Sequence, residues 1–539
     1  MVKLIAMRPK ITNFGFWLTA FVGIVSCGQQ HPVGVTESIE TVLRRGLGGE
    51  PASLDPAAAV DTFSTQILQD VYEGLTVESS SGEVIPGVAT SWQVDQTGTK
   101  YTFQLRKDAL WSNGKHIRAQ DFATAWKRVL DPKRGSPVAN DLRLIEGAVE
   151  IMSGRAAPNS LGVETPTDEV LVVNLVQPAP FFPELVAHSS AFPVYSEESA
   201  RSHDGGSWVS NGPYLLSSWQ PGSQIVLTRN QRYWDAKTVH VPSVQYHFAP
   251  DQNAQFAAYR AGQLDMTDTI PPNAIASIRS EHPSEIVIAP YLATAYYGLN
   301  FDRPPFKGNK QLRQALAMAI DRARLVEALG LGQISALGFV PPNSWNYSPQ
   351  RWTWESLSNT DRIAEAKKLY AEAGYSSRRP LALRLLYNSN PEIKQTALII
   401  AAMWKEVLGV DTEFIDEEFR VYLQSRHDKA KWEVVRLAWN ADYSDASNFL
   451  EIFRSTSPNN DTGYSDQGVD TLLDDAGKSV DPDVRRRLLE TAERSVLDAY
   501  PIIPLYFLVS KRLVKPYVVG VKPNPLDRVY SKSITIASH

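Results

Sequence analysis

Two charged residues in the C-terminal third of the chain have the type and position to hold a charged ligand. Arg436 lies in the β-rich run Trp432 to Trp439 and shares a strand face with Val434 and Ala438. Asp442 follows just past the predicted end of that strand, where open α/β sheets bind their ligands. A guanidinium among apolar neighbours needs a carboxylate, which a ligand or an internal acid could supply. Asp442 could equally be a solvated turn residue, because Asp is common in turns.

Catalytic signatures are absent from the sequence. No HExxH, GxSxG or GxxxxGK[ST] motif occurs, and the nine histidines never pair at i,i+3 or i,i+4. In Gly330-Leu331-Gly332 the third glycine of a dinucleotide fingerprint is missing, since Ser335 takes its place. This run follows a helical pattern, which predicts a helix-ending turn. The motifs give no support to an enzyme, and we expect neither a cofactor nor a metal.

The single cysteine, Cys27, directly follows an apolar run from Phe14 to Val25 that is preceded by a basic leader. This run is too short to cross a bilayer comfortably, so it indicates a secretory signal. Ile24 to Cys27 resembles a bacterial lipobox, in which the cysteine becomes a lipid-bearing N-terminus. We therefore predict a lipoprotein signal peptide at 1–26, a tether at 27–40, and an exported protein of the periplasm or cell envelope that is anchored to the membrane. The alternative for Cys27 is an ordinary buried thiol.

The composition excludes one class of partner. The formal net charge is −5, from 54 basic and 59 acidic residues, and becomes about −8 without residues 1–26. A chain without a basic excess is a poor partner for nucleic acid. Hydrophobic residues make up 43% and charged residues 21%, as in ordinary globular proteins. A mature chain of roughly 500 residues exceeds one core, so we expect two or three domains.

The elements around the candidate residues alternate between strands and helices. In the first half, the patterns predict a strand at Lys100 to Leu105, a turn at Asn113-Gly114 and a helix at Ala119 to Leu130. In the second half, they predict a helix at Ile363 to Ala373, a strand at Leu381 to Tyr387, a helix at Thr396 to Leu408 ended by Gly409, and a strand from Val410 to Phe414. The strand–helix–strand order indicates an α/β fold with a parallel strand pair.

Several short runs, in order along the chain, resemble the extracytoplasmic solute-binding proteins that feed ABC peptide importers. Those in the first part are Gly49 to Pro56, Pro86 to Trp92, Leu105 to Gly114, Asn211 to Tyr214, Arg229-Asn230 with Tyr233-Trp234, and Arg313 to Arg322. The C-terminal third is most similar to the oligopeptide-binding branch, through Leu386 to Asn388, Trp439 to Tyr443 and Arg512 to Pro516. The resemblance covers the chain from about Leu43 onward.

This resemblance implies a fold and a function. The implied fold is a two-lobed clamp of periplasmic-binding-protein type II with a third domain that enlarges the first lobe. Its expected parts are a discontinuous lobe I (41–72, 196–292 and 510–539), an extra domain (73–195) and lobe II (293–509). The implied function is the substrate-binding lipoprotein of an ABC-type peptide importer, which closes on its ligand by a hinge. The implied partners are a peptide, the permease subunits and, through Cys27, the membrane; we expect a monomer.

The resemblance also implies a binding site. Asp442 would pair with the α-amino group of the peptide, and Arg436 would meet the C-terminus of a short one. The peptide backbone would lie as an added strand against protein main chain. Arg426 and His427 match cleft positions for longer peptides, although such a pair could also be a solvated loop. The peptide-binding residues so implied are Asp442, Arg436, Asn440, Trp439, Ala438, Thr62, Arg426, His427, Leu508 and Val138.

The chain departs from the branch at several cleft positions. Val138 and Leu508 replace aromatic residues, and Gly298, Gly330 and Ile393 replace an acid, a lysine and a histidine. We therefore expect a ligand with a free amino terminus but a different preference for length and side chains. A cell-wall (murein) peptide or another cargo such as a metal chelate remains an alternative, and an exported hydrolase is a further one.

Overall fold

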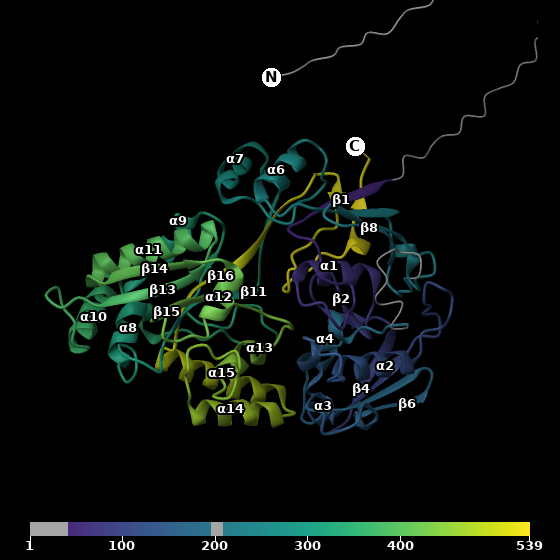
Figure 1. The fold of residues 1–539 in the computed structure, drawn as a ribbon, viewed down its shortest axis with the longest axis horizontal. Coiled ribbons are helices and arrows are strands. Elements are labelled where there is room, and N and C mark those ends of the chain that lie inside the picture. Colours follow the sequence, from purple (N-terminus) through teal and green to yellow (C-terminus); the bar gives the residue numbers. More distant parts are fainter. Residues whose placement is uncertain (1–40, 196–207, 539) are drawn as a thin grey trace, which may run out of the picture. The chain divides into compact units, whose positions relative to one another are not determined.

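The computed structural model describes residues 41–195 and 208–538, which form three larger β-sheets and their covering helices (Figure 1). The predicted signal peptide, the tether with Cys27 and the segment 196–207 lie outside the described residues.

The first sheet has the strand order β1-β10-β9-β8. Its members are β1 (Val42–Leu47), β8 (Tyr214–Gln220), β9 (Gln224–Arg229) and β10 (Ser243–Phe248). β1 runs parallel to β10, with Leu43 opposite Val244, and the other pairs are antiparallel. α1 (Thr62–Val71) packs against this sheet, whereas α6 (Gln252–Arg260) and α7 (Ile275–Glu281) follow β10 and contribute Tyr259, Ile275 and Ile278 to a different hydrophobic cluster. β1 and the later strands are far apart in the sequence, so this sheet needs long-range pairing.

The second sheet has the order β4-β5-β7-β6. Its strands are β4 (Ala89–Val94), β5 (Lys100–Leu105), β6 (Val163–Thr167) and β7 (Val170–Asn174). Near it lie the β2–β3 hairpin (Thr76–Glu78 with Val84–Pro86), α2 (Ala119–Leu130), α3 (Ala148–Met152) and α4 (Phe182–Leu185). The predicted strand and helix coincide with β5 and α2, and the predicted turn is confirmed by the positive φ of Gly114, 86°.

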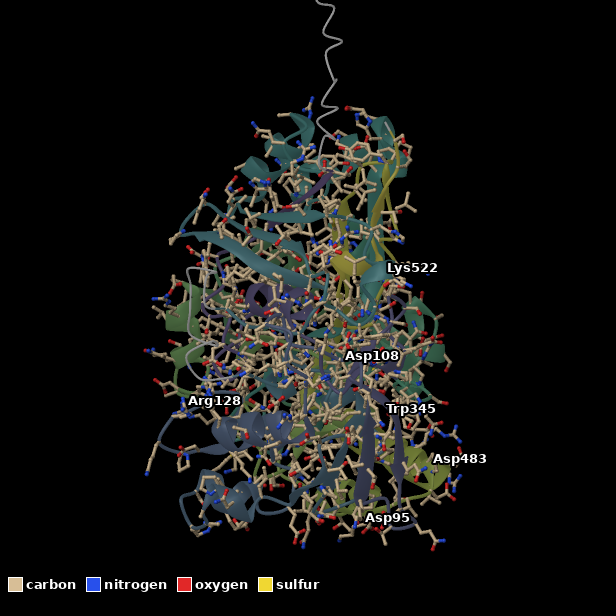
Figure 2. All side chains as sticks on the ribbon, turned by 90° about the vertical axis from the view of Figure 1, so that its right-hand side faces the viewer. Asp95, Asp108, Arg128, Trp345, Asp483 and Lys522 are labelled. Atoms are coloured by element: carbon tan, nitrogen blue, oxygen red, sulfur yellow. The ribbon has the colours of Figure 1, made fainter. Side chains whose placement is uncertain are left out.

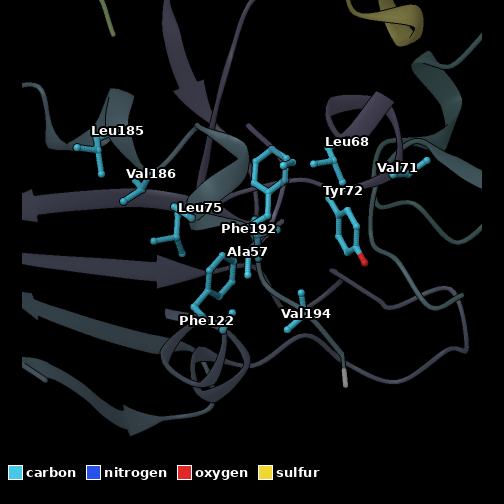
Figure 3. Close-up of a cluster of buried hydrophobic side chains, with 14 of the residues drawn as sticks. Ala57, Leu68, Val71, Tyr72, Leu75, Phe122, Leu185, Val186, Phe192 and Val194 are labelled. Atoms are coloured by element: carbon cyan, nitrogen blue, oxygen red, sulfur yellow. The ribbon is translucent and has the colours of Figure 1, made fainter. Parts of the chain in front are cut away.

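One hydrophobic cluster joins these two sheets. It contains Leu43 and Val244 from the first sheet together with Phe103 and Leu171 from the second, all fully buried. Between them, side chains from several elements interdigitate (Figure 3): Ala57, Leu68, Val71, Tyr72, Leu75, Phe122, Leu185, Val186, Phe192 and Val194. Because burying one such side chain stabilises the fold by about 1.5–3 kcal/mol, the second sheet is bound firmly to the first.

The third sheet has six strands in the order β12-β16-β11-β15-β13-β14. They are β11 (Ile286–Leu299), β12 (Ile334–Ser335), β13 (Ala382–Asn388), β14 (Asp411–Glu417), β15 (Val434–Asn440) and β16 (Ile502–Leu513). β13 and β14 are parallel and joined by α11 (Pro391–Leu408), as predicted, and Gly409 ends this helix in the left-handed conformation. α11 begins earlier than predicted, because the Asn390 side chain caps it ahead of Pro391.

Helices cover both faces of this third sheet. One cluster contains Leu385 and Val434 with residues of α8 (Lys310–Ala319), α9 (Arg322–Leu329), α10 (Asn359–Glu372) and α11. The other contains Leu386 and Val435 with residues of α12 (Phe419–Ser425), α13 (Ala446–Leu450), α14 (Gln467–Lys478) and α15 (Pro482–Ala499). Successive residues of a strand point to opposite faces, so the two clusters lie on opposite sides of the sheet. The predicted helix is found in α10, and Gly330 ends α9 as predicted.

Two long strands, β11 and β16, lead from the third sheet towards the first (Figure 1). They pair antiparallel from Ile286 opposite Leu513 to Gly298 opposite Ile502. Beyond β16 the chain forms β17 (Val518–Val519) and β18 (Thr535–Ile536) and returns to β1. There the buried guanidinium of Arg45 donates to the Val529 carbonyl at 3.0 Å and to Ser531 Oγ at 2.7 Å. The exact domain boundaries stay predictions.

A buried ion pair fixes the short helix that follows β15. Asp445 caps α13 by accepting from the Ser447 N–H at 2.8 Å. The same carboxylate accepts from both terminal nitrogens of Arg485 on α15, at 2.7 and 2.8 Å. Both side chains are almost fully buried. α13 is too short to be stable by itself, so this pair holds it in place.

We expect Arg485→Met to lower the free energy of unfolding by about 3–5 kcal/mol, because it leaves the Asp445 carboxylate buried without its cation. Urea denaturation would measure the change. The control is Arg487→Met, an exposed position on the same helix, which should change stability by no more than about 0.5 kcal/mol. Equal effects of the two substitutions would contradict the structural role of the pair.

Candidate functional site

One edge of β15 is left without a strand neighbour at its C-terminal end. β13 pairs with β15 only through Val434 and Val435, whereas β11 pairs with it along its whole length. From Arg436 to Asn440, therefore, no strand in the described residues covers the other edge. Such an edge offers main-chain N–H and C=O groups to an extended chain.

A cavity of about 440 Å³ opens at the end of this strand. It lies between two walls that are far apart in the sequence. One wall consists of residues between Asn140 and Ser190, near the second sheet, and the other of residues from Trp439 to Asn459. The lining residues are Asn140, Asp141, Arg143, Leu185, His188, Ser190, Trp439, Asp442, Tyr443, Asn448, Glu451, Ile452, Arg454, Thr456, Ser457, Pro458 and Asn459. Its volume suits a small organic ligand.

Asn448 on α13 orients two residues of this cavity. Its side-chain oxygen accepts from Trp439 Nε1 at 2.8 Å and from the Asp442 N–H at 3.4 Å. Its amide nitrogen donates to Asp442 Oδ2 at 3.3 Å. Asn448 is itself buried. The Asp442 carboxylate is therefore held in one orientation at the wall of the cavity, and its other oxygen accepts no hydrogen bond from the described residues.

Asp442 has no basic partner in the part of the chain that the structure describes. Arg528 comes near, but its guanidinium donates to the Asp442 carbonyl at 3.4 Å and forms a buried ion pair with Glu78 instead. Asp442 is exposed to solvent. The surrounding protein nevertheless raises its pKa, and Asn448, Arg528 and Arg143 oppose that rise. Because this carboxylate has no cation beside it, binding of a cationic group would stabilise its charged form.

The opposite wall carries a second acid, Asp141. Burial raises its pKa to about 6, and the negative charge of Asp442 adds to the rise. His188 Nδ1 lies 3.7 Å from Asp141 Oδ2 and 2.8 Å from Ser190 Oγ. Burial also lowers the pKa of His188 to about 3. His188 is thus a neutral imidazole at physiological pH, and its contact with Asp141 is polar rather than ionic.

The two walls meet beside the cavity. Phe181 from one and Tyr443 from the other stack with ring centroids 4.5 Å apart and planes within 4°. The Ser444 N–H donates to Glu184 Oε2 at 2.6 Å. Burial raises the pKa of Glu184 to about 7. At the lower end of Figure 2, Asp95 marks the turn between β4 and β5, and Asp483 marks the start of α15. These two regions also approach each other, since a Cβ on Gly98 would lie 3.1 Å from the Val480 side chain.

Arg436 is half-buried on β15 and has no carboxylate within ion-pair distance among the described residues. Burial raises the pKa of Tyr506, and the nearby Arg436 guanidinium opposes that rise. The internal ion pair that the sequence allowed as an alternative is therefore not present in this part of the chain. The Arg436 guanidinium, which is always charged, therefore remains available to bind an anion.

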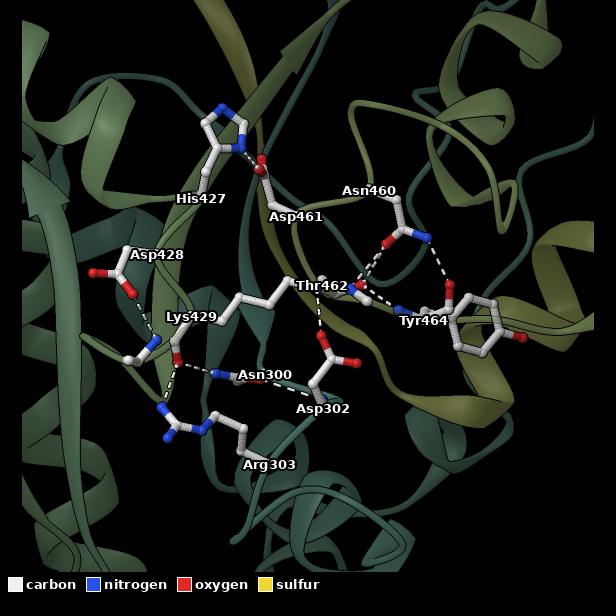
Figure 4. Close-up of polar contacts among 12 residues, drawn as sticks. Asn300, Asp302, Arg303, His427, Asp428, Lys429, Asn460, Asp461, Thr462 and Tyr464 are labelled. Carbon is white, nitrogen blue, oxygen red and sulfur yellow. Dashed lines mark hydrogen bonds and ion pairs between the residues drawn. The ribbon is translucent and has the colours of Figure 1, made fainter.

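Arg426 and His427 follow α12, the first half-buried and the second exposed, and both lie beside the buried Asp461. Figure 4 shows His427 against this acid. His427 Nδ1 lies 3.1 Å from Asp461 Oδ1, and Arg426 Nε lies 3.8 Å from Asp461 Oδ2. Burial raises the pKa of Asp461, and these two bases oppose the rise. Asp461 stands two residues beyond Asn459, which lines the cavity, so the pair borders the site without lining it.

The remaining predicted residues are dispersed. Ala438 and Asn440 lie on the uncovered edge of β15, whereas exposed Thr62 begins α1. Val138 is buried in the core next to the segment that carries Asp141, and Leu508 packs against the core beneath the third sheet. The structure therefore brings Trp439 and Asp442 into the cavity and leaves Val138 out of its lining.

The positions where the chain departs from the branch have different surroundings. Gly298 lies in β11, where a Cβ would come within 2.9 Å of Leu437. Ile393 is buried among the residues of α11. Neither residue lines the second cavity, of about 300 Å³, whose lining contains Tyr291, Leu292, Phe507 and several prolines.

Sequence reasoning missed several residues of the cavity. Asn448 gave only a faint signal, as a polar residue within the apolar helix Ala446–Leu450. Asp141, Arg143 and His188 gave no signal, because no local sequence pattern links them to β15. Within residues 41–195 and 208–538, no three acids, histidines or cysteines gather as metal ligands. In the same ranges, no helix has both the length and the apolar character needed to cross a membrane.

The fold and the cavity define a ligand-binding protein of α/β architecture, and comparison with known proteins identifies its family. The model of the bacterial extracellular solute-binding proteins, family 5 Middle, matches residues 83–461. The chain belongs to this family. It is a two-lobed extracytoplasmic solute-binding protein with a third domain, and not an enzyme.

Individual relatives match almost the entire chain. The periplasmic oligopeptide-binding protein OppA of Escherichia coli is 35% identical over 544 residues, which cover 99% of both chains. The solved structure of the E. coli murein tripeptide binding protein MppA has a TM-score of 0.81 at 33% identity and covers 93% of this chain and 99% of that one. Haemophilus influenzae OppA in complex with the peptide RPPGFSPFR has a TM-score of 0.78 at 31% identity, with 93% and 99% covered.

The charges of Asp442 and Arg143 should influence the titration of Asp141. We expect the Asp141 carboxyl to titrate near pH 6, as its pKa of about 6 indicates. Asp442→Asn should lower this pKa, because it removes a neighbouring negative charge, and Arg143→Gln should raise it. Carbon-13 NMR of labelled aspartate would measure both shifts. An Asp141 pKa that stays the same in both variants would contradict the electrostatic link across the cavity.

Proposed function

We propose that the protein is the substrate-binding component of an ABC-type peptide importer and captures short peptides that have a free amino terminus. The observation that carries this proposal is the Asp442 carboxylate, which is oriented by Asn448 in a cavity and lacks a cation in the described chain. An ammonium group would complete its hydrogen bonds. Relatives that bind oligopeptides and a murein tripeptide support a peptide as the ligand.

The peptide backbone would bind along the uncovered edge of β15. Its amino terminus would lie at Asp442, and the next residues would run back beside Asn440, Trp439 and Ala438. This direction is antiparallel to β15, and the added strand would gain main-chain hydrogen bonds without reference to side-chain identity. Such recognition accepts many sequences, because side chains then occupy hydrated space.

The far end of a short peptide would meet positive charge. Arg436 lies at the start of the uncovered edge and has no carboxylate partner in the described residues. A peptide of a few residues that runs from Asp442 towards Arg436 would place its α-carboxylate there. Arg426 and His427 already share Asp461, so longer peptides would have to compete for them.

Closure would rest on β11 and β16, which connect the third sheet to the rest of the described chain. The stack of Phe181 on Tyr443 and the bond from Ser444 to Glu184 are contacts that a separation of the two walls would break. With the walls together, the ligand is removed from water. This strengthens its ion pair with Asp442.

We expect Asp442→Asn to weaken the binding of a tripeptide with a free amino terminus by about 30-fold or more. Loss of one partner of a desolvated charge pair costs about 2–5 kcal/mol. Isothermal titration calorimetry would measure the affinity of both proteins.

The matched control is the same tripeptide with an acetylated amino terminus, which should bind weakly to both proteins. Asp168→Asn, an exposed aspartate remote from the cavity lining, should leave the affinity unchanged. If Asp442→Asn bound the free tripeptide as tightly as the parent, Asp442 would not be the anchor.

We further propose that Cys27 carries a lipid that holds the protein on the membrane beside its permease. The lipobox-like run Ile24 to Cys27 supports this. In cells fed radiolabelled palmitate, the parent protein should be labelled and sediment with membranes. Cys27→Ser should abolish the label and release the protein from the membrane fraction. A labelled Cys27→Ser variant would exclude this attachment site.

A further inference from the structure

The second cavity, of about 300 Å³, lies beside the two strands that connect the third sheet to the rest of the described chain. Its lining includes Tyr291 and Leu292 of β11 and Phe507 of β16, and it shares no lining residue with the cavity at the end of β15. The register of β11 against β16 shifts between Pro290 and Thr294. The cavity therefore lies at a break in the ladder of the connecting strands.

Leu292 has no ladder partner in β16 at this break, and its main chain bonds elsewhere. Its N–H donates to the Pro525 carbonyl at 2.6 Å, and its carbonyl accepts from the Ala441 N–H at 2.8 Å. Pro525 lines the second cavity, and Ala441 directly precedes Asp442. One residue of β11 therefore joins the second cavity to the proposed peptide site through two hydrogen bonds.

The lining of the second cavity carries no formal charge. Its eleven residues are five prolines, two asparagines, and one each of leucine, phenylalanine, tyrosine and serine. Burial raises the pKa of the Tyr291 phenol, so this side chain stays neutral. An ion that entered the cavity would lose water without gaining a partner of opposite charge. The lining therefore favours an uncharged ligand.

Prolines and a tight turn hold this lining in place. Proline has a fixed φ, so a wall of prolines loses little conformational freedom when a ligand binds. The turn that contains Ser81 packs so closely on the C-terminal segment that a Cβ on Gly82 would overlap the Pro525 ring. Flat proline and aromatic surfaces suit a planar aromatic ring. Tyr291 and Asn343 form no side-chain hydrogen bond within the described residues, so their polar groups are available to a ligand.

The walls of the second cavity come from both ends of the connecting strands. Ser81 lies between β2 and β3, and the segment 523–525 packs on that turn. The segment 341–343 follows Val340, which belongs to the core of the third sheet. A molecule that touches both sides binds best when they are placed as they are here, with the two walls of the first cavity in contact.

We propose that the second cavity is a binding site for a small uncharged molecule that has a planar aromatic ring and one hydrogen-bond donor, and that its occupation favours the form in which the two walls of the first cavity are in contact. The ring packs against Phe507 and the prolines, and the Asn343 side-chain oxygen accepts from the donor. The effect on the walls rests on the proposed function, whereas the site itself does not. By linkage, this molecule and a peptide each raise the affinity for the other by the same factor.

Fluorine-19 NMR with 5-fluoroindole as the probe tests the site on the full-length protein without any peptide. We expect saturable binding of the probe. 5-Fluoroindole-3-acetate should bind about 10-fold more weakly or worse, because its carboxylate meets no cation in the cavity.

Two substitutions locate the probe. Ser81→Trp places a large side chain at the exposed rim of the cavity and should weaken binding of the probe by about 10-fold or more. Asn343→Gly removes the acceptor without strain, because Asn343 has a φ of 73°, and should weaken binding by about 3-fold or more. The matched control is Ser223→Trp, at an exposed serine in the turn between β8 and β9, which should bind the probe as the parent does.

A saturating tripeptide with a free amino terminus should tighten binding of the probe by about 5-fold or more, and calorimetry should show the same gain in tripeptide affinity when the probe is saturating. No saturable binding, displacement of the probe by the tripeptide, or full binding by Ser81→Trp and Asn343→Gly would overturn the second site. Unchanged affinities in both directions would overturn its effect on the walls. If no tripeptide bound at all, the peptide function would fail, and the probe titrations would still decide whether the second site exists.

Discussion

A carboxylate that is held by a hydrogen bond at the wall of a cavity and left without a cation is the constraint on which the proposed function depends. Asp442 meets both conditions in the described structure while it stays exposed to solvent, because Asn448 orients it and Arg528 is already engaged by Glu78. Asn448 in turn sits on α13, which the ion pair of Asp445 with Arg485 fixes to α15. The proposed anchor thus relies on the hydrogen bond from Asn448 and on the buried pair of Asp445 with Arg485.

The charged residues in and around the site fall into two groups, those that are paired and those that are not. Strong pairs such as Asp445 with Arg485 hold helices together, whereas Asp442, Asp141, Arg143 and Arg436 are left uncompensated in or beside the ligand space. Unpaired charges destabilise a folded protein unless water or a ligand solvates them. A cavity that opens to solvent meets that requirement, and in the proposed function closure on a ligand would replace water with matched groups. β11 and β16 run as continuous paired strands from the third sheet towards the first, so such a closure would leave the third sheet unbroken.

The sequence predicted the elements with strong local patterns and the class of protein. β5 and α2 have the predicted bounds because their periods of 2 and 3.6 are undisturbed. The parallel pair of β13 and β14 follows from a strand–helix–strand order that leaves few alternatives. The residues of the opposite wall could not be predicted from the sequence, because Asp141 and His188 come near Asp442 only through the packing of two sheets. The partner of Arg426 and His427 was missed for the same reason, since Asp461 lies on another loop.

The bare edge of β15 has one more consequence. Exposed strand edges usually invite other chains to pair with them and lead to aggregation. Here the edge ends at Trp439 and Asp442 in a narrow space, with the Phe181–Tyr443 stack closing one side. In the proposed function the same bare edge is the place where a peptide adds as a strand. The feature that would expose another protein to aggregation is then the one that binds the ligand.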